Sequence, residues 1–124
     1  MQQTRYFTPR EANETLPLVK KIVADILKTG ARLRNLAMEH GRDSRQQPAV
    51  REVMAEVDEL CSELENIGCS YKDWNFNLGL VDFPSVIDGE EVLLCWRSDE
   101  ADILFFHGMH DGYAGRRPIP DTCL

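Results

Sequence analysis

Apolar residues recur at alternating spacings of three and four along the segment Ala12 to Ala37. This spacing places them on one narrow stripe of a helix, so it predicts a long amphipathic helix with a seam for a second helix. The segment Thr8 to Glu11 supplies the start, because threonine can cap, proline suits the first helical position and glutamate completes a capping box. The helix is expected to end at His40.

Two residues interrupt this stripe. Pro17 lacks a backbone N–H and is expected to kink the helix or to split off a short first piece. Gly30 lies on the seam, where the missing side chain lets another helix approach closely. After a polar loop at 42–47, Pro48 opens a second apolar stripe, and Gly68 is placed to end it as a left-handed cap.

The periodicity then changes to the alternation that is typical of strands. Strands are predicted at Cys69 to Lys72, Leu80 to Ile87, Glu90 to Arg97 and Asp102 to His107. Asp88-Gly89 stands between the second and third of these, and Asp-Gly between apolar runs is a strong signal for a hairpin. The sequence therefore predicts a small antiparallel meander.

The expected fold class is α+β in a single domain, residues 1–124. It combines a long antiparallel helical hairpin, residues 8–68, with an antiparallel β-meander and a C-terminal loop, residues 69–117. Two interpretations of the hairpin stay open. It packs against its own sheet, or it is completed by a second copy as a four-helix bundle and makes a homodimer.

A two-residue turn at Asp88-Gly89 fixes the pairing of the two flanking strands. It places Asp82 opposite Cys95, and because side chains alternate along a strand, it divides the pair into two faces. The core face carries Val81, Phe83, Ile87, Val92, Leu94 and Trp96, and the polar face carries Leu80, Asp82, Val86, Leu93, Cys95 and Arg97. The polar group is a candidate site or a structural ion pair. The register of the strand that contains His107 is left undetermined.

The loop after the last predicted strand offers two further candidate sites. His107, His110 and Asp111 are suitable donors for zinc, iron or manganese and could supply three ligands to a divalent transition metal ion, or Asp82 could complete the set. An anion pocket is the competing interpretation, in which backbone N–H groups and cations bind a small anionic ligand through Arg97, Gly112, Gly115 and Arg116. In a third interpretation, the loop is structural and only covers the sheet edge. The last residues, 118–124, are expected to form a tail.

Charge and composition exclude several classes of function. The net charge of −7 disfavours nucleic acid and anionic membrane surfaces as partners. The chain shows no apolar signal-peptide core and no apolar run of the length that spans a membrane, so a cytoplasmic location is expected. The four cysteines are widely and irregularly spaced, which favours free thiols in a reducing compartment.

The segments FTPREANETLP, ENIGC, GLVDFPSVIDGEEVLLCWR and HDGYAGRRPI occur in this order. Together they resemble an uncharacterised bacterial family, domain of unknown function 2203, some of whose members carry the label "division initiation protein". The resemblance covers nearly the whole chain and implies no established activity, cofactor or partner. The residues that match its pattern include Asp82, Phe83, Pro84, Cys95, Trp96, Arg97, Glu100, His107, Gly112, Gly115 and Arg116. His110 is not matched, which favours His107 as the histidine of a site.

Two functional hypotheses follow, and neither decides whether the protein is an enzyme. The first is a small-ligand or metal-binding domain with a site between the polar sheet face and the C-terminal loop. Its candidate catalytic residues are Asp82, Cys95, Arg97 and Glu100. The thiol would serve as a nucleophile only if a neighbouring cation lowered its pKa. The alternative is a non-catalytic interaction module that dimerises through its helical hairpin.

Overall fold

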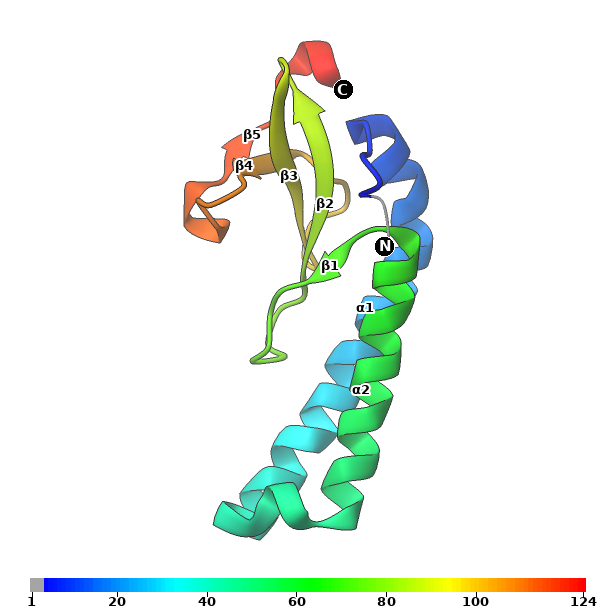
Figure 1. Ribbon diagram of the computed structural model, residues 1–124, viewed down its shortest axis with the longest axis vertical. Helices are drawn as coiled ribbons and strands as arrows, with labels where there is room; N and C mark the ends of the chain where they lie inside the picture. Colours follow the sequence, from blue (N-terminus) through cyan, green and yellow to red (C-terminus); the bar gives the residue numbers. More distant parts are fainter. Residues whose placement is uncertain (1–3) are drawn as a thin grey trace.

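The computed structural model describes residues 4–124 and has the predicted α+β class (Figure 1). A helical hairpin leads into a five-stranded antiparallel sheet in which the strands follow one another in chain order. The helical elements are α1 (Pro9–His40), η1 (Gly41–Gln46), α2 (Pro48–Ile67), η2 (Tyr113–Gly115) and η3 (Asp121–Cys123). The strands are β1 (Ser70–Tyr71), β2 (Leu80–Ile87), β3 (Glu90–Arg97), β4 (Phe105–Gly108) and β5 (Arg117–Pro118).

The start of α1 is the predicted capping box. Thr8 Oγ1 accepts from the Glu11 N–H at 3.1 Å, and Glu11 Oε1 accepts from the Thr8 N–H at 3.0 Å. Of the two outcomes expected at Pro17, a kink or a split, the split is wrong, because α1 continues through this residue to His40. Proline removes only one helical hydrogen bond here, and buried residues on both sides, among them Leu16 and Val19, hold the helix against the core.

Gly30 makes the predicted close approach, but not to a helix. A Cβ atom at this position would lie 2.2 Å from Cγ of Phe76, a residue of the loop between β1 and β2. The Phe76 ring therefore occupies the space that a side chain at Gly30 would need. At the end of α2, Gly68 adopts the predicted left-handed conformation, with φ 115°. Both glycines therefore join the hairpin to the sheet.

The pairing of β2 with β3 follows the predicted register. Asp82 lies opposite Cys95 and Val81 lies opposite Trp96. All six residues of the predicted core face are buried, and this face packs in one cluster with the apolar stripes of α1 and α2. The alternation of apolar and polar residues in the two strands was therefore sufficient to predict which face of β2 and β3 packs on the core.

The last predicted strand is wrong in its bounds. It was expected at Asp102 to His107, but β4 is Phe105–Gly108. The side chain of Asn13 replaces a strand partner before it: Oδ1 accepts from the Ile103 N–H at 2.7 Å, and Nδ2 donates to the Ile103 carbonyl at 3.2 Å. In β4, Phe106 pairs with Leu94 on the core side, so His107, one residue further on, points to the polar face.

The C-terminal residues are not a tail. Arg117 and Pro118 form β5 against β4, and the Ile119 N–H donates to the Leu104 carbonyl at 2.8 Å. Ile119 is buried, and Cys123 packs against the core cluster. The chain after the loop is therefore part of the fold, because Ile119 supplies one more apolar side chain to the core.

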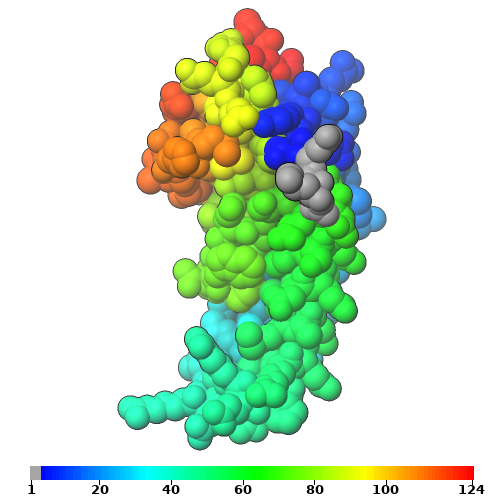
Figure 2. Space-filling view, viewed as in Figure 1, coloured from blue at the N-terminus to red at the C-terminus, as the bar shows by residue number. Residues whose placement is uncertain are grey.

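The hairpin contacts the sheet over only part of its length. The helices lie on one side of the sheet, and the distal end of the hairpin projects beyond it (Figures 1 and 2). The buried residues of α1 stop at Gly30, within the described part of the chain. The half of the hairpin near the sheet thus packs as the first interpretation expected. No helix among residues 4–124 is both long enough and apolar enough to span a bilayer.

Candidate metal centre

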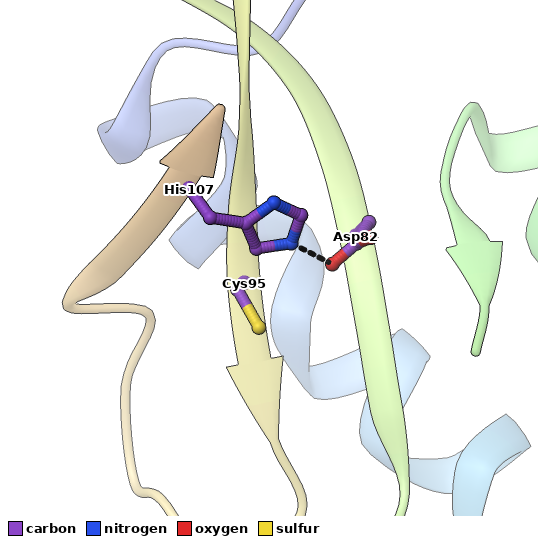
Figure 3. Close-up of side chains that lie close together, drawn as sticks. All are labelled: Asp82, Cys95 and His107. Carbon is purple, nitrogen blue, oxygen red and sulfur yellow. Dashed lines mark hydrogen bonds and ion pairs between the residues drawn. The ribbon is translucent and has the colours of Figure 1, made fainter. Parts of the chain in front are cut away.

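Three neighbouring strands bring Asp82, Cys95 and His107 together on the polar face (Figure 3). Each residue offers one donor atom, and these atoms all lie within 4.8 Å of one another. Asp82 is 6% exposed, Cys95 1% and His107 3%, so all three donors are largely shielded from water. A carboxylate, a thiol and an imidazole so close together can hold a metal ion.

The hydrogen bonds of His107 fix the state of its ring. Nδ1 lies 2.8 Å from the Gly108 carbonyl oxygen, which can only accept, so Nδ1 carries the hydrogen. The other ring nitrogen, Nε2, lies 3.2 Å from Oδ1 of Asp82. A neutral ring with its hydrogen on Nδ1 has an acceptor at Nε2, and such a ring would present this acceptor to the buried Asp82 carboxylate. A proton or a metal ion between them satisfies both.

Cys95 does not meet the condition for a ready nucleophile. Burial, and after it the negative charge of Asp82, raise the pKa of its thiol to about 11, while Arg116 acts in the opposite direction. A free thiol with such a pKa is protonated at neutral pH and is a poor nucleophile. A metal ion bound at this position would replace the thiol proton.

A cavity of about 400 Å³ opens beside the three donors. It is lined by Lys72, Leu80, Asp82, Leu93, Cys95, His107, Met109, His110, Gly112 and Tyr113. The donors therefore lie in the wall of a space that is large enough for a small molecule.

Arg97, Glu100 and Arg116 form a second cluster, which we call the arginine cluster. Glu100 Oε1 accepts from Nη2 of Arg116 at 2.5 Å and from the Arg97 N–H at 2.8 Å. Arg116 Nη2 also donates to the Cys95 carbonyl at 3.0 Å, and its guanidinium lies 4.3 Å from the centroid of the Phe105 ring. These charges are bound to partners within the protein.

Arg97 is similarly engaged. Its Nε lies 2.6 Å from Oδ1 of Asp99, and Nη1 donates to the Tyr113 hydroxyl. Neither arginine lines the cavity. Both arginines of the predicted anion pocket thus contact acceptors of the protein, and among residues 4–124 Nε of Arg116 is buried without a hydrogen-bond partner.

The structure separates the three predicted metal ligands of the loop. His107 belongs to the buried donor group, His110 lies exposed on the cavity wall, and Asp111 is used by the loop itself. Oδ2 of Asp111 accepts from the Gly108 N–H at 3.1 Å. A Cβ atom at Gly115 would lie 2.5 Å from Cβ of Asp111, so only glycine at this position leaves room for the Asp111 side chain. Gly112 has a positive φ of 65° and borders the cavity.

Lys72 is a cavity residue that the sequence patterns did not single out. Its N–H donates to the Leu80 carbonyl at 2.8 Å, directly beyond the pair Tyr71 and Val81, so Lys72 lies across from Leu80 on the polar face. The signal was present in the predicted strand Cys69 to Lys72. It becomes usable only when the pairing of that strand with β2 is known.

A comparison with protein-family models identifies the chain as a match to the family described as "Uncharacterized conserved protein (DUF2203)" over residues 5–119. The chain belongs to this family. The search of curated proteins gives no match, and neither does the search of solved structures. The family match assigns no ligand and no reaction to this DUF2203 protein.

Proposed function

We propose that this DUF2203 protein binds one divalent transition metal ion, zinc in the first instance, through Asp82, Cys95 and His107. The observation that carries the proposal is the convergence of three possible ligand atoms: Asp82 Oδ1 and His107 Nε2 lie 3.2 Å apart, next to a buried thiol. A bound cation would attract all three donors at once. It would also compensate the cost of burying a carboxylate.

The arrangement of His107 supports a metal rather than a shared proton. Metal-bound histidines commonly donate their second ring N–H to a backbone carbonyl or a carboxylate, which orients the ring. The Nδ1–H of His107 makes this contact with Gly108. A proton between Asp82 and His107 would need no third donor, whereas Cys95 places a sulfur within 4.8 Å of both. A sulfur and an imidazole nitrogen favour zinc over magnesium or calcium.

Three protein donors leave a tetrahedral ion one free position, as in catalytic zinc sites. The cavity of about 400 Å³ borders all three donors, so an exogenous molecule could reach that position. A zinc ion there would act as a Lewis acid and lower the pKa of a bound water to about 7. The residues of the chain would hold the ion, orient His107 through Gly108 and shield the donors from bulk water.

Elemental analysis of the full chain, purified without a histidine tag, tests the proposal. We expect one zinc ion per chain in the native protein and none in Cys95→Ala. Cys61→Ala is the matched control, because Cys61 is a buried free thiol in α2 outside the donor group. Cobalt-loaded protein should show a sulfur-to-cobalt charge-transfer band that Cys61→Ala retains and Cys95→Ala loses.

The proposal is wrong if the native chain binds no zinc, cobalt, iron or manganese at stoichiometric level. It is also wrong if the ion and its charge-transfer band persist in Cys95→Ala, since the ligands would then lie elsewhere.

Dimerisation through the helical hairpin is the second candidate function. Its support is the projecting end of the hairpin, where α1 has no buried residue after Gly30 and the Met38 side chain is 78% exposed. Light scattering at micromolar concentration should give the mass of two chains for the native protein and of one chain for Met38→Glu. Ala24→Glu, at an exposed position of the packed half of α1, is the control. A monomeric native protein would rule out the dimer.

A further inference from the structure

We infer that the cavity beside the metal centre binds a small organic carboxylate, which approaches the ion while Lys72 supplies the opposing charge. The inference rests on the metal site proposed above.

The donor group would carry two negative charges when it holds a metal ion. Asp82 contributes one negative charge and a metal-bound Cys95 thiolate contributes another, whereas His107 binds metals as a neutral ring. These two negative charges balance a divalent cation. The loaded centre thus has no net charge with which to repel an anion, and its free position can accept an oxygen donor.

Lys72 adds a positive charge to the wall of the cavity. Its side chain lines the cavity and makes no ion pair within residues 4–124. The neighbouring carboxylate of Asp73 is engaged instead by backbone N–H groups, those of Asn75, Asn77 and Leu78. An ammonium group without a carboxylate partner, at the wall of a partly enclosed space, attracts an anion.

Tyr113 adds a polar contact from a distant part of the chain. Its hydroxyl accepts a hydrogen bond from Arg97, and the residue lines the cavity. A phenol oxygen that accepts from a guanidinium keeps its own O–H for donation to another acceptor. Lys72 and Tyr113 thus come from different segments and offer a cation and a donor to the same space.

The remaining walls limit the size and the polarity of the ligand. Leu80, Leu93 and Met109 present apolar surface, which suits a short aliphatic chain. The volume of about 400 Å³ is at the lower end of the range for small-molecule sites, about 300–1,000 Å³. A small acid with a short apolar part fits these walls.

Butyrate, with butyramide as its uncharged counterpart, is a suitable probe for cobalt-loaded full-length protein. We expect butyrate to shift the visible cobalt spectrum in a saturable manner and butyramide to leave it unchanged. Lys72→Met should raise the dissociation constant for butyrate about tenfold, and Lys72→Arg should restore most of the affinity. Lys21→Met, at an exposed position of α1 that lines no part of this cavity, is the control.

The outcomes separate this inference from the metal proposal. If Lys72→Met holds one cobalt ion and binds butyrate as tightly as the native chain, the role of Lys72 is wrong and the metal centre stands. If butyrate leaves the spectrum unchanged, or butyramide shifts it equally, the carboxylate ligand is wrong and the metal centre again stands. A native chain that binds no metal would overturn both.

Discussion

Two clusters of polar side chains meet at β3, which contributes Cys95 to one and Arg97 to the other, and they differ in how their charges are satisfied. In the arginine cluster, Glu100 accepts from Arg116 and from the backbone of Arg97, and each guanidinium has a further partner within the protein. In the donor group, Oδ1 of Asp82 lies 3.2 Å from Nε2 of His107, beside the Cys95 thiol. In the arginine cluster the carboxylate is paired with a guanidinium, whereas among residues 4–124 no arginine or lysine forms an ion pair with Asp82.

This difference separates a structural role from a functional one. Buried charges that are paired with good geometry hold elements together, and they have little left to offer a ligand. Buried donors that converge without an internal cation, at the wall of a cavity, are typical of a binding site. Arg97, Glu100 and Arg116 therefore support the loop that covers the site, whereas Asp82, Cys95 and His107 form the candidate site itself.

Removal of one donor should have the largest effect. We expect His107→Ala to weaken zinc binding by roughly three orders of magnitude, since zinc binding by a full set of ligands is worth about 10–16 kcal/mol and each ligand supplies a large share. Competition with a chromophoric chelator measures the affinity. His110→Ala is the control, because His110 borders the cavity outside the donor group. Loss of zinc in His110→Ala and not in His107→Ala would assign the ion to the loop.

Disruption of the arginine cluster should reduce stability and leave the metal in place. Arg116→Met leaves the Glu100 carboxylate, whose side chain is only 15% exposed, without its cation. The expected loss in the free energy of unfolding is about 2–3 kcal/mol, measured by urea denaturation. The double variant Arg116→Met with Glu100→Gln should lose less than the sum of the single changes. A loss of zinc affinity as large as that of His107→Ala would contradict the division into two clusters.

The pH dependence of zinc affinity tests whether the thiol belongs to the donor group. The pKa of Cys95 is about 11 in the metal-free chain, so zinc must displace the thiol proton at any pH below that value. Affinity should therefore rise about tenfold for each pH unit, or 1.36 kcal/mol, between about pH 6 and 8. The dependence should become shallower by one proton in Cys95→Ala, if residual binding is measurable. An equal slope in both proteins would exclude the thiol as a ligand.

The smallest effect is expected at the exposed edge of the arginine cluster. The side chains of Arg97 and Asp99 are 30% and 50% exposed, so solvent screens their ion pair. Asp99→Asn should change the free energy of unfolding by less than about 1 kcal/mol and leave zinc affinity unaltered. Thermal unfolding with and without zinc measures both effects. A destabilisation as large as that of Arg116→Met would show that the whole cluster acts as one unit.

Features that depend on neighbours in the chain were predictable from the sequence. The capping box at Thr8, the end of α2 at Gly68 and the hairpin turn at Asp88-Gly89 each involve residues a few positions apart. The turn alone set the pairing of Asp82 with Cys95, because a two-residue turn leaves one register for its strands. Local sequence therefore suffices to place two members of the donor group on one face of the sheet.

The third member and its surroundings were decided by contacts between distant parts of the chain. Asn13 of α1 binds the backbone of Ile103 and delays the start of β4, and Phe106 takes the inward position next to the core. These long-range contacts direct His107 to the polar face, where it meets Asp82 and Cys95. In the same way, Phe76 rather than a helix fills the space at Gly30.

The sequence by itself thus determined the helices, the central hairpin of the sheet and the face that carries Asp82 and Cys95, because local hydrogen bonds and periodicity specify them. Only the tertiary structure decided which histidine joins them, that Arg97 and Arg116 are neutralised within the protein, and that Lys72 borders the cavity. Each of these features depends on contacts between residues that lie far apart in the sequence. Such contacts form only when the whole chain packs.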